Sequence, residues 1–151
     1  MHRNKQPTPV LGWREWVSLP GLHVDQIKAK IDTGARTSCL HAYDIKEYKK
    51  GRKTFVKFKI HPLQRDDEFI LSAKAELIDK RKIKDSGGTV TIRPVIRTTV
   101  ECGDYRWDIE LTLIGRDQMG FRMLLGRQGV RGKFLINPGK SYLLGDAKEP
   151  T

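Results

Sequence analysis

The chain has 151 residues, 38% of them hydrophobic and 31% charged, and its 29 Lys and Arg against 18 Asp and Glu give a formal charge of +11. This length is enough for one domain with a sizeable core, and no apolar run approaches the ~20 residues of a membrane-spanning helix. We therefore expect no membrane partner, and the absence of an apolar signal-peptide core predicts a cytoplasmic location. The positive charge favours nucleic acid or acidic peptides without choosing between them.

The domain is expected to cover residues 10–145, between a flexible arm at 1–9 and a short tail at 146–151. The arm is polar and holds two prolines, which favour a loose segment. After it, Trp13 and Trp16 indicate an edge strand or a short helix, and Pro20-Gly21 indicates a turn into the next strand.

That next strand leads to the first candidate for chemistry, Asp32. Apolar residues at 27, 29 and 31 alternate with two lysines, which predicts a half-buried strand that runs straight into this carboxylate. A carboxylate there is costly unless it is hydrogen-bonded or functional. Thr33 offers a hydroxyl and Gly34 allows a tight turn, so short-range donors can hold it. The alternative is an ordinary loop turn.

Further strands are predicted at 37–42, 55–60 and 68–78, with a polar connector at 43–51. One hairpin spans 82–92 and turns at Ser86-Gly87-Gly88. The chain continues with a second hairpin, which joins 95–100 to 105–114.

The C-terminal part is expected to hold a short helix over 124–130, limited by glycines, and then strand, turn and strand over 133–144. Regularly spaced strands with turn signals indicate an all-β fold. We expect a closed or nearly closed β-barrel.

Two motifs occur in a characteristic order. Asp32-Thr33-Gly34-Ala35 is followed about 90 residues later by Met123-Leu124-Leu125-Gly126-Arg127. The pair resembles the retropepsins, the retroviral-type aspartic peptidases, in which the second motif braces the active-site loop and leads into a short helix. The string over 32–42 is similar to a bacterial retropepsin-like family labelled an ATP-dependent zinc protease, which is associated with glutamate ligases that modify ribosomal protein tails. The resemblance implies an acid-protease β-barrel with one short C-terminal helix.

The resemblance implies that the protein is an aspartic endopeptidase in which Asp32, Thr33 and Gly34 form the catalytic loop. It implies structural support of that loop by Leu124, Leu125, Gly126 and Arg127. Such enzymes use two carboxylates about 3 Å apart that share one proton. The chain holds one Asp-Thr-Gly, so we expect a C2 homodimer in which each copy supplies one carboxylate.

The hairpin tip at Ser86, Gly87 and Gly88 is a candidate flap that closes over a peptide, and the alternative is a plain exposed turn. Its flanks are basic, with Lys80, Arg81, Lys82, Lys84 and Arg93. Together with Ala35 and Arg36, the tip forms the expected substrate-binding set. A peptide or protein substrate, with a preference for acidic segments, is therefore expected.

Arg36 departs from the viral pattern, in which the residue after Asp-Thr-Gly-Ala is usually acidic or small. Its guanidinium would favour the ionised carboxylates or bind an acidic substrate residue. Alternatively, it points to solvent and pairs with Asp44 or Glu47. We expect activity that is weaker or more narrowly specific than that of an ordinary retropepsin.

No metal and no cofactor are expected. The zinc-binding His-Glu-x-x-His motif and the phosphate-binding Gly-x-x-x-x-Gly-Lys-Ser/Thr motif are both absent from the sequence. Cys39, His41, His61 and Cys102 are the residues that would have to gather around a metal. We read the two cysteines as reduced thiols, and a strand cysteine is more often a core residue than a ligand.

Binding of nucleic acid is a second expectation, after a peptide or protein substrate. The densest basic run holds Lys46, Lys49, Lys50, Arg52, Lys53, Lys57 and Lys59, interleaved with three aromatic residues. Such a pattern suits single-stranded nucleic acid, although a solvated basic face is the commoner outcome. The rival function is a non-catalytic basic β-barrel that binds RNA or the ribosome, and a third is a scaffold that keeps the peptidase fold only to dimerise.

Overall fold

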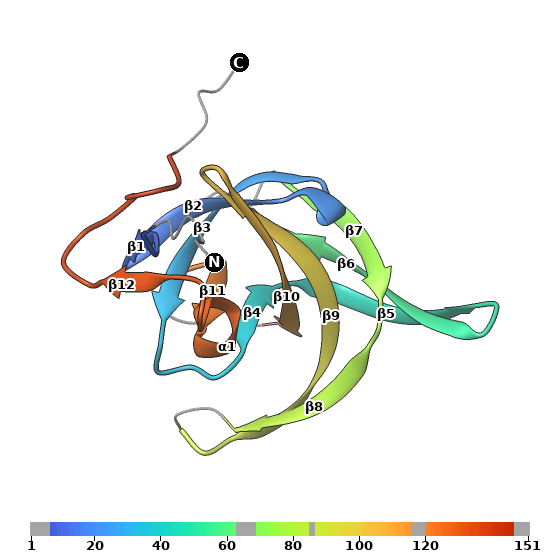
Figure 1. The fold of residues 1–151 in the computed structure, drawn as a ribbon. Coiled ribbons are helices and arrows are strands. Elements are labelled where there is room, and N and C mark those ends of the chain that lie inside the picture. Colours follow the sequence, from blue (N-terminus) through green and yellow to red (C-terminus); the bar gives the residue numbers. More distant parts are fainter. Residues whose placement is uncertain (1–6, 63–68, 85–86, 116–119, 147–151) are drawn as a thin grey trace, which may run out of the picture.

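The computed structural model describes residues 7–62, 69–84, 87–115 and 120–146 (Figure 1). The strands are β1 (Val10–Gly12), β2 (Arg14–Leu19), β3 (Val24–Asp32), β4 (Ser38–His41), β5 (Tyr43–Lys50), β6 (Lys53–Ile60), β7 (Leu71–Glu76), β8 (Asp79–Lys84), β9 (Val90–Cys102), β10 (Tyr105–Ile114), β11 (Met123–Gly126) and β12 (Leu135–Asn137). The helices are the 3-10 turn η1 (Pro20–Leu22) and α1 (Arg127–Val130). None of the helices in these ranges is long and apolar enough to cross a bilayer.

The main sheet has the order β10-β4-β11-β3-β2-β9-β8, and β10 also pairs with β9. That extra pairing closes the first six strands into a ring and leaves β8 outside it, hydrogen-bonded to β9. Alternate residues of the ring strands point inward and form the core, as Ile27, Ala29 and Leu111 show with 0% exposure each. The prediction of an all-β fold with one short helix near the C-terminus is confirmed.

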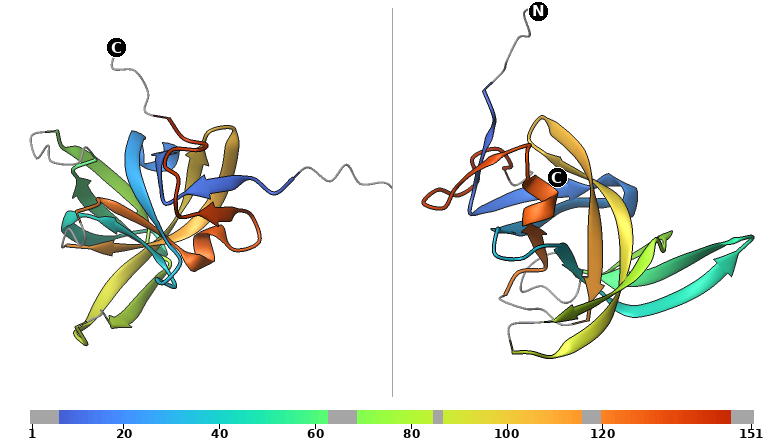
Figure 2. Two further views of the ribbon diagram at one scale, coloured as in Figure 1. Left: turned by 90° about the vertical axis from the view of Figure 1, so that its left-hand side faces the viewer. Right: turned by 60° about the horizontal axis from the view of Figure 1, so that its bottom comes forward.

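β2 lies inside the sheet, between β3 and β9, so the prediction of an edge strand or helix there is only partly right. The predicted connector at 43–51 is wrong, because Tyr43–Lys50 forms the strand β5. Its side chains do not alternate in polarity, but its backbone pairs along most of its length with β6. With β7 these strands form a three-stranded sheet whose hairpin β5–β6 projects from the body (Figures 1 and 2).

Two further expectations need correction. The runs at 90–92 and 95–100 belong to one strand, β9, which continues through Pro94 opposite Lys80 on the edge strand β8. The helix begins at Arg127, because residues 123–126 are a strand between β3 and β4. Of the strand, turn and strand expected at 133–144, only β12 forms, and it pairs in parallel with β1.

The segment that follows β12 is held by a buried carboxylate. Glu15 on β2 has 0% exposure and accepts hydrogen bonds from four backbone N–H groups, those of Gly12 (2.6 Å), Leu143 (2.9 Å), Leu144 (3.1 Å) and Gly145 (2.8 Å). A buried charge is tolerable only with such compensation. The carboxylate therefore fixes the C-terminal segment against β1 and β2.

Glu15→Ala is expected to lower the free energy of unfolding by at least about 3 kcal/mol, because four buried donors lose their acceptor together. Urea unfolding followed by circular dichroism measures this loss. The control is Asp25→Ala, which removes an exposed carboxylate from β3 and should change stability by less than about 0.5 kcal/mol. Equal stability of the Glu15 variant and the parent would contradict the assignment.

Candidate active site

Asp32 is the last residue of β3, and the chain turns sharply after it. The Gly34 N–H donates to Asp32 Oδ1 at 3.1 Å, and the Ala35 N–H donates to the Asp32 carbonyl at 3.2 Å. Asp32 is half-buried, whereas Thr33 and Gly34 are exposed. The loop thus holds one carboxylate oxygen by a short-range donor, as the sequence predicts, and leaves the carboxylate partly open to solvent.

The second motif lies directly beside this loop. β11 runs parallel to β3, with Leu125 opposite Ile31 and Gly126 opposite Asp32. Arg127 then binds the loop twice, because its Nη1 donates to the Thr33 carbonyl at 2.9 Å and its N–H to the Ala35 carbonyl at 2.7 Å. These two hydrogen bonds restrict the movement of the loop backbone and therefore position the Asp32 carboxylate.

Gly126 allows the close approach of these two segments. A Cβ at this position would lie 2.5 Å from both the carbonyl carbon and the oxygen of Thr37 and 3.0 Å from the oxygen of Ala35. The Gly126 N–H donates to the buried Ser38 Oγ at 3.0 Å, and Ser38 in turn accepts a 3.0 Å bond from Thr112 on its carbonyl. The loop, β11, β4 and β10 are therefore locked together by backbone and hydroxyl groups.

A groove of about 890 Å³ opens beside Asp32, between the active-site loop and the β8–β9 hairpin. In Figure 1 the hairpin lies below the turn that joins β3 to β4. A second cavity of about 420 Å³ shares Thr37, Glu110 and Gln128 with the groove and continues it toward α1. The two cavities therefore adjoin each other, and Asp32 lines the larger one.

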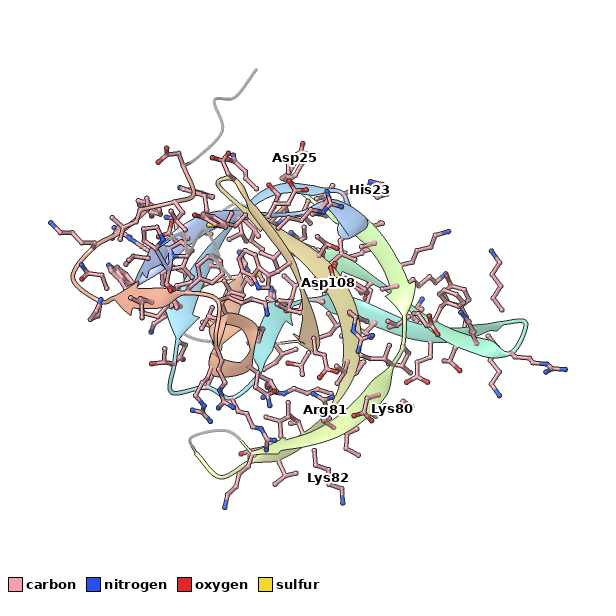
Figure 3. The ribbon with its side chains drawn as sticks, in the orientation of Figure 1. His23, Asp25, Lys80, Arg81, Lys82 and Asp108 are labelled. Atoms are coloured by element: carbon pink, nitrogen blue, oxygen red, sulfur yellow. The ribbon has the colours of Figure 1, made fainter. Side chains whose placement is uncertain are left out.

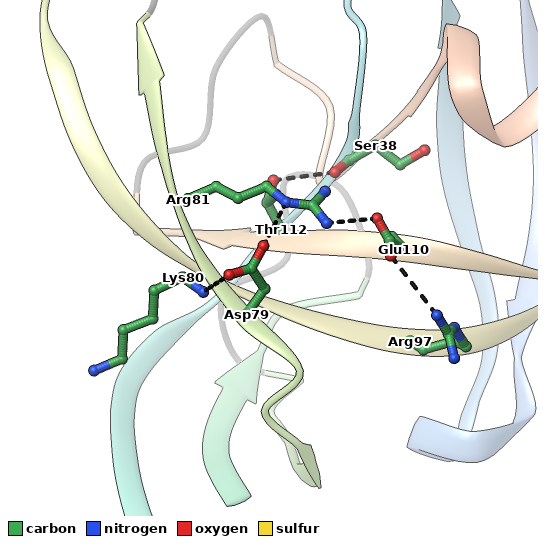
Figure 4. A network of polar contacts seen from close by, with 7 residues as sticks. All are labelled: Ser38, Asp79, Lys80, Arg81, Arg97, Glu110 and Thr112. Atoms are coloured by element: carbon green, nitrogen blue, oxygen red, sulfur yellow. Dashed lines mark hydrogen bonds and ion pairs between the residues drawn. The ribbon is translucent and has the colours of Figure 1, made fainter. Parts of the chain in front are cut away.

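The groove is basic. Its charged lining residues are Arg36, Arg81, Lys82, Lys84 and Arg93 against Asp32 and Glu110. Figure 3 shows Arg81 on the side of β8 that faces the body of the molecule and Lys82 on the other side. Arg81 is neutralised, because it contacts Asp79 at 2.9 Å and Glu110 at 2.7 Å (Figure 4). These bonds raise the pKa of Arg81 and lower that of Asp79, and they tie the hairpin base to β10.

Arg93 stands opposite Arg81 across the β8–β9 ladder and therefore faces the same side. Its side chain is almost buried, with the residue 8% exposed, and its Nε donates to Thr91 Oγ1 at 3.1 Å. No carboxylate of the described residues forms an ion pair with it. A nearly buried guanidinium without a counter-charge is costly. Among the described residues of the groove, Arg93 is therefore a nearly buried cation for which no carboxylate partner is present.

Of the other residues predicted to bind substrate, some line the groove and some do not. Ala35 and Arg36 line the groove together with Leu124, whereas Leu125 is buried in the core. The alternative pairing of Arg36 is wrong, because Asp44 binds Lys59 at 3.3 Å and Glu47 binds Lys80 at 2.6 Å. Gly87 and Gly88 are exposed at the hairpin tip and do not line the groove, and Ser86 lies outside the described residues.

The residues considered for a metal lie in different environments. Cys39 borders the groove, Cys102 contacts the Trp16 carbonyl at 3.6 Å, and His61 stacks on Tyr43 with ring centroids 4.7 Å apart. Both cysteines are free thiols, and burial raises the pKa of Cys39 to about 11 and that of Cys102 to about 12. Within the described ranges no three His, Cys, Asp or Glu side chains gather as a metal site.

A single Asp-Thr-Gly loop, braced by a parallel Leu-Leu-Gly strand and facing a groove under a β-hairpin, defines a protein of the retropepsin-like class. Residues 10–146 match the family described as retropepsin-like aspartic endopeptidase RimB, and the chain belongs to this RimB-like family. That description names an aspartic endopeptidase where the resemblance noted from the sequence carried the label of a zinc protease.

Relatives of the chain carry a different name. This chain is 41% identical over 140 residues to a "Probable alpha-L-glutamate ligase" of Shewanella halifaxensis. It is 40% identical over 140 residues to a protein of the same name from Parasynechococcus marenigrum. Each match covers 93% of this chain but only 31% and 30% of those proteins, so the chain spans less than a third of their length. The crystal structure of a Legionella pneumophila protein of unknown function has a similar fold, with a TM-score of 0.76, 25% identity and coverage of 91% of this chain and 98% of that one.

Proposed function

We propose that the protein is an aspartic endopeptidase in which two copies meet about a two-fold axis and each lends Asp32 to one active site. The observation that carries this proposal is the position of Asp32, at the end of a braced loop and on the wall of a groove of about 890 Å³. Thr33 and Gly34 are exposed beside it and are therefore available for contact with a second copy. Membership of the RimB-like family supports the reaction type.

The need for a second copy follows from the charges in the groove. Among the described residues that line it, Glu110 is the one carboxylate besides Asp32. Its oxygens are already engaged by two cations, Arg81 at 2.7 Å and Arg97 at 3.7 Å. An aspartic peptidase needs two carboxylates that share a proton. The symmetry-related Asp32 is the group that supplies the second one.

In this assembly the two carboxylates would divide the work on one peptide bond. The ionised carboxylate takes a proton from a water molecule, which attacks the carbonyl carbon, while the protonated carboxyl donates to the carbonyl oxygen. The roles then reverse as the amine leaves with a proton. A peptide bound along the groove would lie extended and form main-chain hydrogen bonds with the β8–β9 hairpin.

Acidic segments are the substrates that the groove suits best. Its uncompensated cations, with Arg93 nearly buried among them, favour glutamate or aspartate side chains. The relatives named glutamate ligases suggest a source, because a ligase that adds glutamate would create such segments. We propose glutamate-rich peptides as the substrate, including tails of ribosomal proteins to which glutamate has been added.

The test is cleavage of matched peptides, one rich in glutamate and one rich in lysine, followed by mass spectrometry at low and high salt. We expect the acidic peptide to be cut faster, and the difference to shrink as salt screens the groove. Equal cleavage rates for the two peptides would contradict the proposed substrate but not the proposed peptidase activity. Absence of cleavage of any peptide by the dimer would remove both.

Arg93→Gln is expected to lower kcat/KM for the acidic peptide about 10- to 100-fold, because a charge-assisted hydrogen bond to a buried carboxylate is lost. The preference for acidic over neutral peptides should fall by the same factor. Arg106→Gln is the matched control, since Arg106 is exposed and pairs with Glu101 at 3.4 Å, away from the groove. If both variants lost activity equally, net charge alone would explain the effect.

A further inference from the structure

A second basic surface lies on the projecting sheet β5-β6-β7. Lys46, Lys57 and Lys74 stand directly opposite one another on three neighbouring strands, so their side chains leave the same face. All three are exposed, and none forms an ion pair with a carboxylate of the described residues. Like charges directly opposite each other destabilise a sheet. The three lysines side by side therefore lower the stability of the fold unless an anion neutralises them.

The burial pattern fixes which side of the sheet carries this row. On β6, Val56, Phe58 and Ile60 are buried and face the core, while Lys57 and Lys59 between them are exposed. We call the outer side the basic sheet face. It consists of Lys46, Tyr48, Lys50, Lys53, Phe55, Lys57, Lys59 and Lys74, with Ser72 and Glu76. Lys59 and Lys53 form half-exposed pairs with Asp44 and Glu76 at 3.3 and 3.7 Å, which reduce the charge only weakly.

Aromatic rings lie beside the lysine row. Tyr48 and Phe55 are cross-strand neighbours on the same face, and their rings stack with centroids 5.7 Å apart and an interplanar angle of 22°. Each is two residues from a lysine of the row, and each is only half-buried. At the other end of β5, Tyr43 stacks on His61. Planar rings between cations suit nucleobases that stack while phosphates meet the ammonium groups.

We propose that the basic sheet face binds single-stranded nucleic acid. An acidic peptide would use the lysines but gives no role to the aromatic pair. An anionic membrane would require several apolar side chains that insert, whereas Phe55 is the one such side chain of the face and is stacked on Tyr48. None of the residues of the face lines the groove at Asp32, so the two sites are separate. Figures 1 and 2 show the β5–β6 hairpin extending away from the body, which leaves this face accessible.

The experiment measures fluorescence anisotropy of labelled oligouridylate of about 12 nucleotides with the full chain, over a series of salt concentrations. The triple variant Lys46→Gln, Lys57→Gln, Lys74→Gln should weaken binding about 10-fold or more and reduce the slope of log K against log salt by about 2. Its Tm should equal or exceed that of the parent, because a row of like charges is removed. Peptide cleavage should be unchanged.

The matched control neutralises the same number of exposed cations elsewhere, with Arg106→Gln, Lys133→Gln and Lys140→Gln. If this control weakened binding as much as the first triple variant, the effect would be one of net charge and the site would be rejected. Phe55→Leu should weaken binding of the oligonucleotide about 5-fold or more but leave polyglutamate unaffected. Competition by polyglutamate equal to that by oligouridylate, or binding to anionic vesicles without binding to the oligonucleotide, would overturn the proposal in favour of a protein or membrane partner.

Discussion

Asp32→Asn is expected to reduce peptide cleavage by about 1,000-fold or more, because the neutral amide can neither accept the proton of water nor share one with its partner. The fold should persist, since Asn has the same shape and its side-chain oxygen still accepts the 3.1 Å hydrogen bond from the Gly34 N–H. We expect unchanged circular dichroism and an unchanged elution volume on gel filtration. The rate is measured as kcat/KM on a glutamate-rich peptide.

Mixing experiments separate a shared active site from two independent ones. If each site needs Asp32 from both copies, equal amounts of parent and variant that exchange subunits leave roughly a quarter of the dimers active. Independent sites would leave half of the total activity. The matched control is Asp25→Asn, an exposed acid on the same strand. Survival of cleavage in the Asp32 variant would refute the peptidase proposal, whatever the oligomeric state.

The elements predicted correctly from the sequence are those in which burial alternates along the chain. β3, β6 and β10 each bury one face in the core, so apolar and polar residues alternate and the period of two is visible. β5 escaped prediction because it lies in a sheet that projects from the body and holds polar residues on both sides. Its hydrogen bonds with β6 come from the backbone, which leaves no trace in side-chain polarity.

The sequence predicts only part of the lining of the groove. Arg93 had been noted as one of five basic residues that flank the hairpin tip, and nothing in the sequence distinguishes it from the other four. Arg93 differs from the other four in being nearly buried, and it differs from Arg81, which faces the same side, in not pairing with Glu110. Glu110 is 29 residues away from Arg81 in the chain. The alternation of apolar and polar residues along a strand does not predict such ion pairs, because they depend on the register between strands.

The bracing of the Asp32 loop was expected from a resemblance and not from periodicity. Met123–Gly126 is buried throughout and reads equally well as a strand or as the start of a helix. The structure shows why the motif ends in glycine, since Gly126 lies against the backbone of Thr37 and Ala35. Arg127 follows at a point where its guanidinium donates to the Thr33 carbonyl and its N–H donates to the Ala35 carbonyl.

Gly126→Ala is expected to cost about 3 kcal/mol of unfolding free energy and to lower kcat/KM by about 100-fold. The new methyl group would lie 2.5 Å from the Thr37 carbonyl, and because the obstacle is backbone, the strand and the loop must move apart. Gly115→Ala is the control, since a Cβ there has its nearest neighbour, the Ala42 oxygen, at 3.9 Å. Urea unfolding and peptide cleavage measure the two effects. A variant that kept its activity after losing stability would show that the position of Asp32 does not depend on this contact, and the support role of β11 would then be wrong.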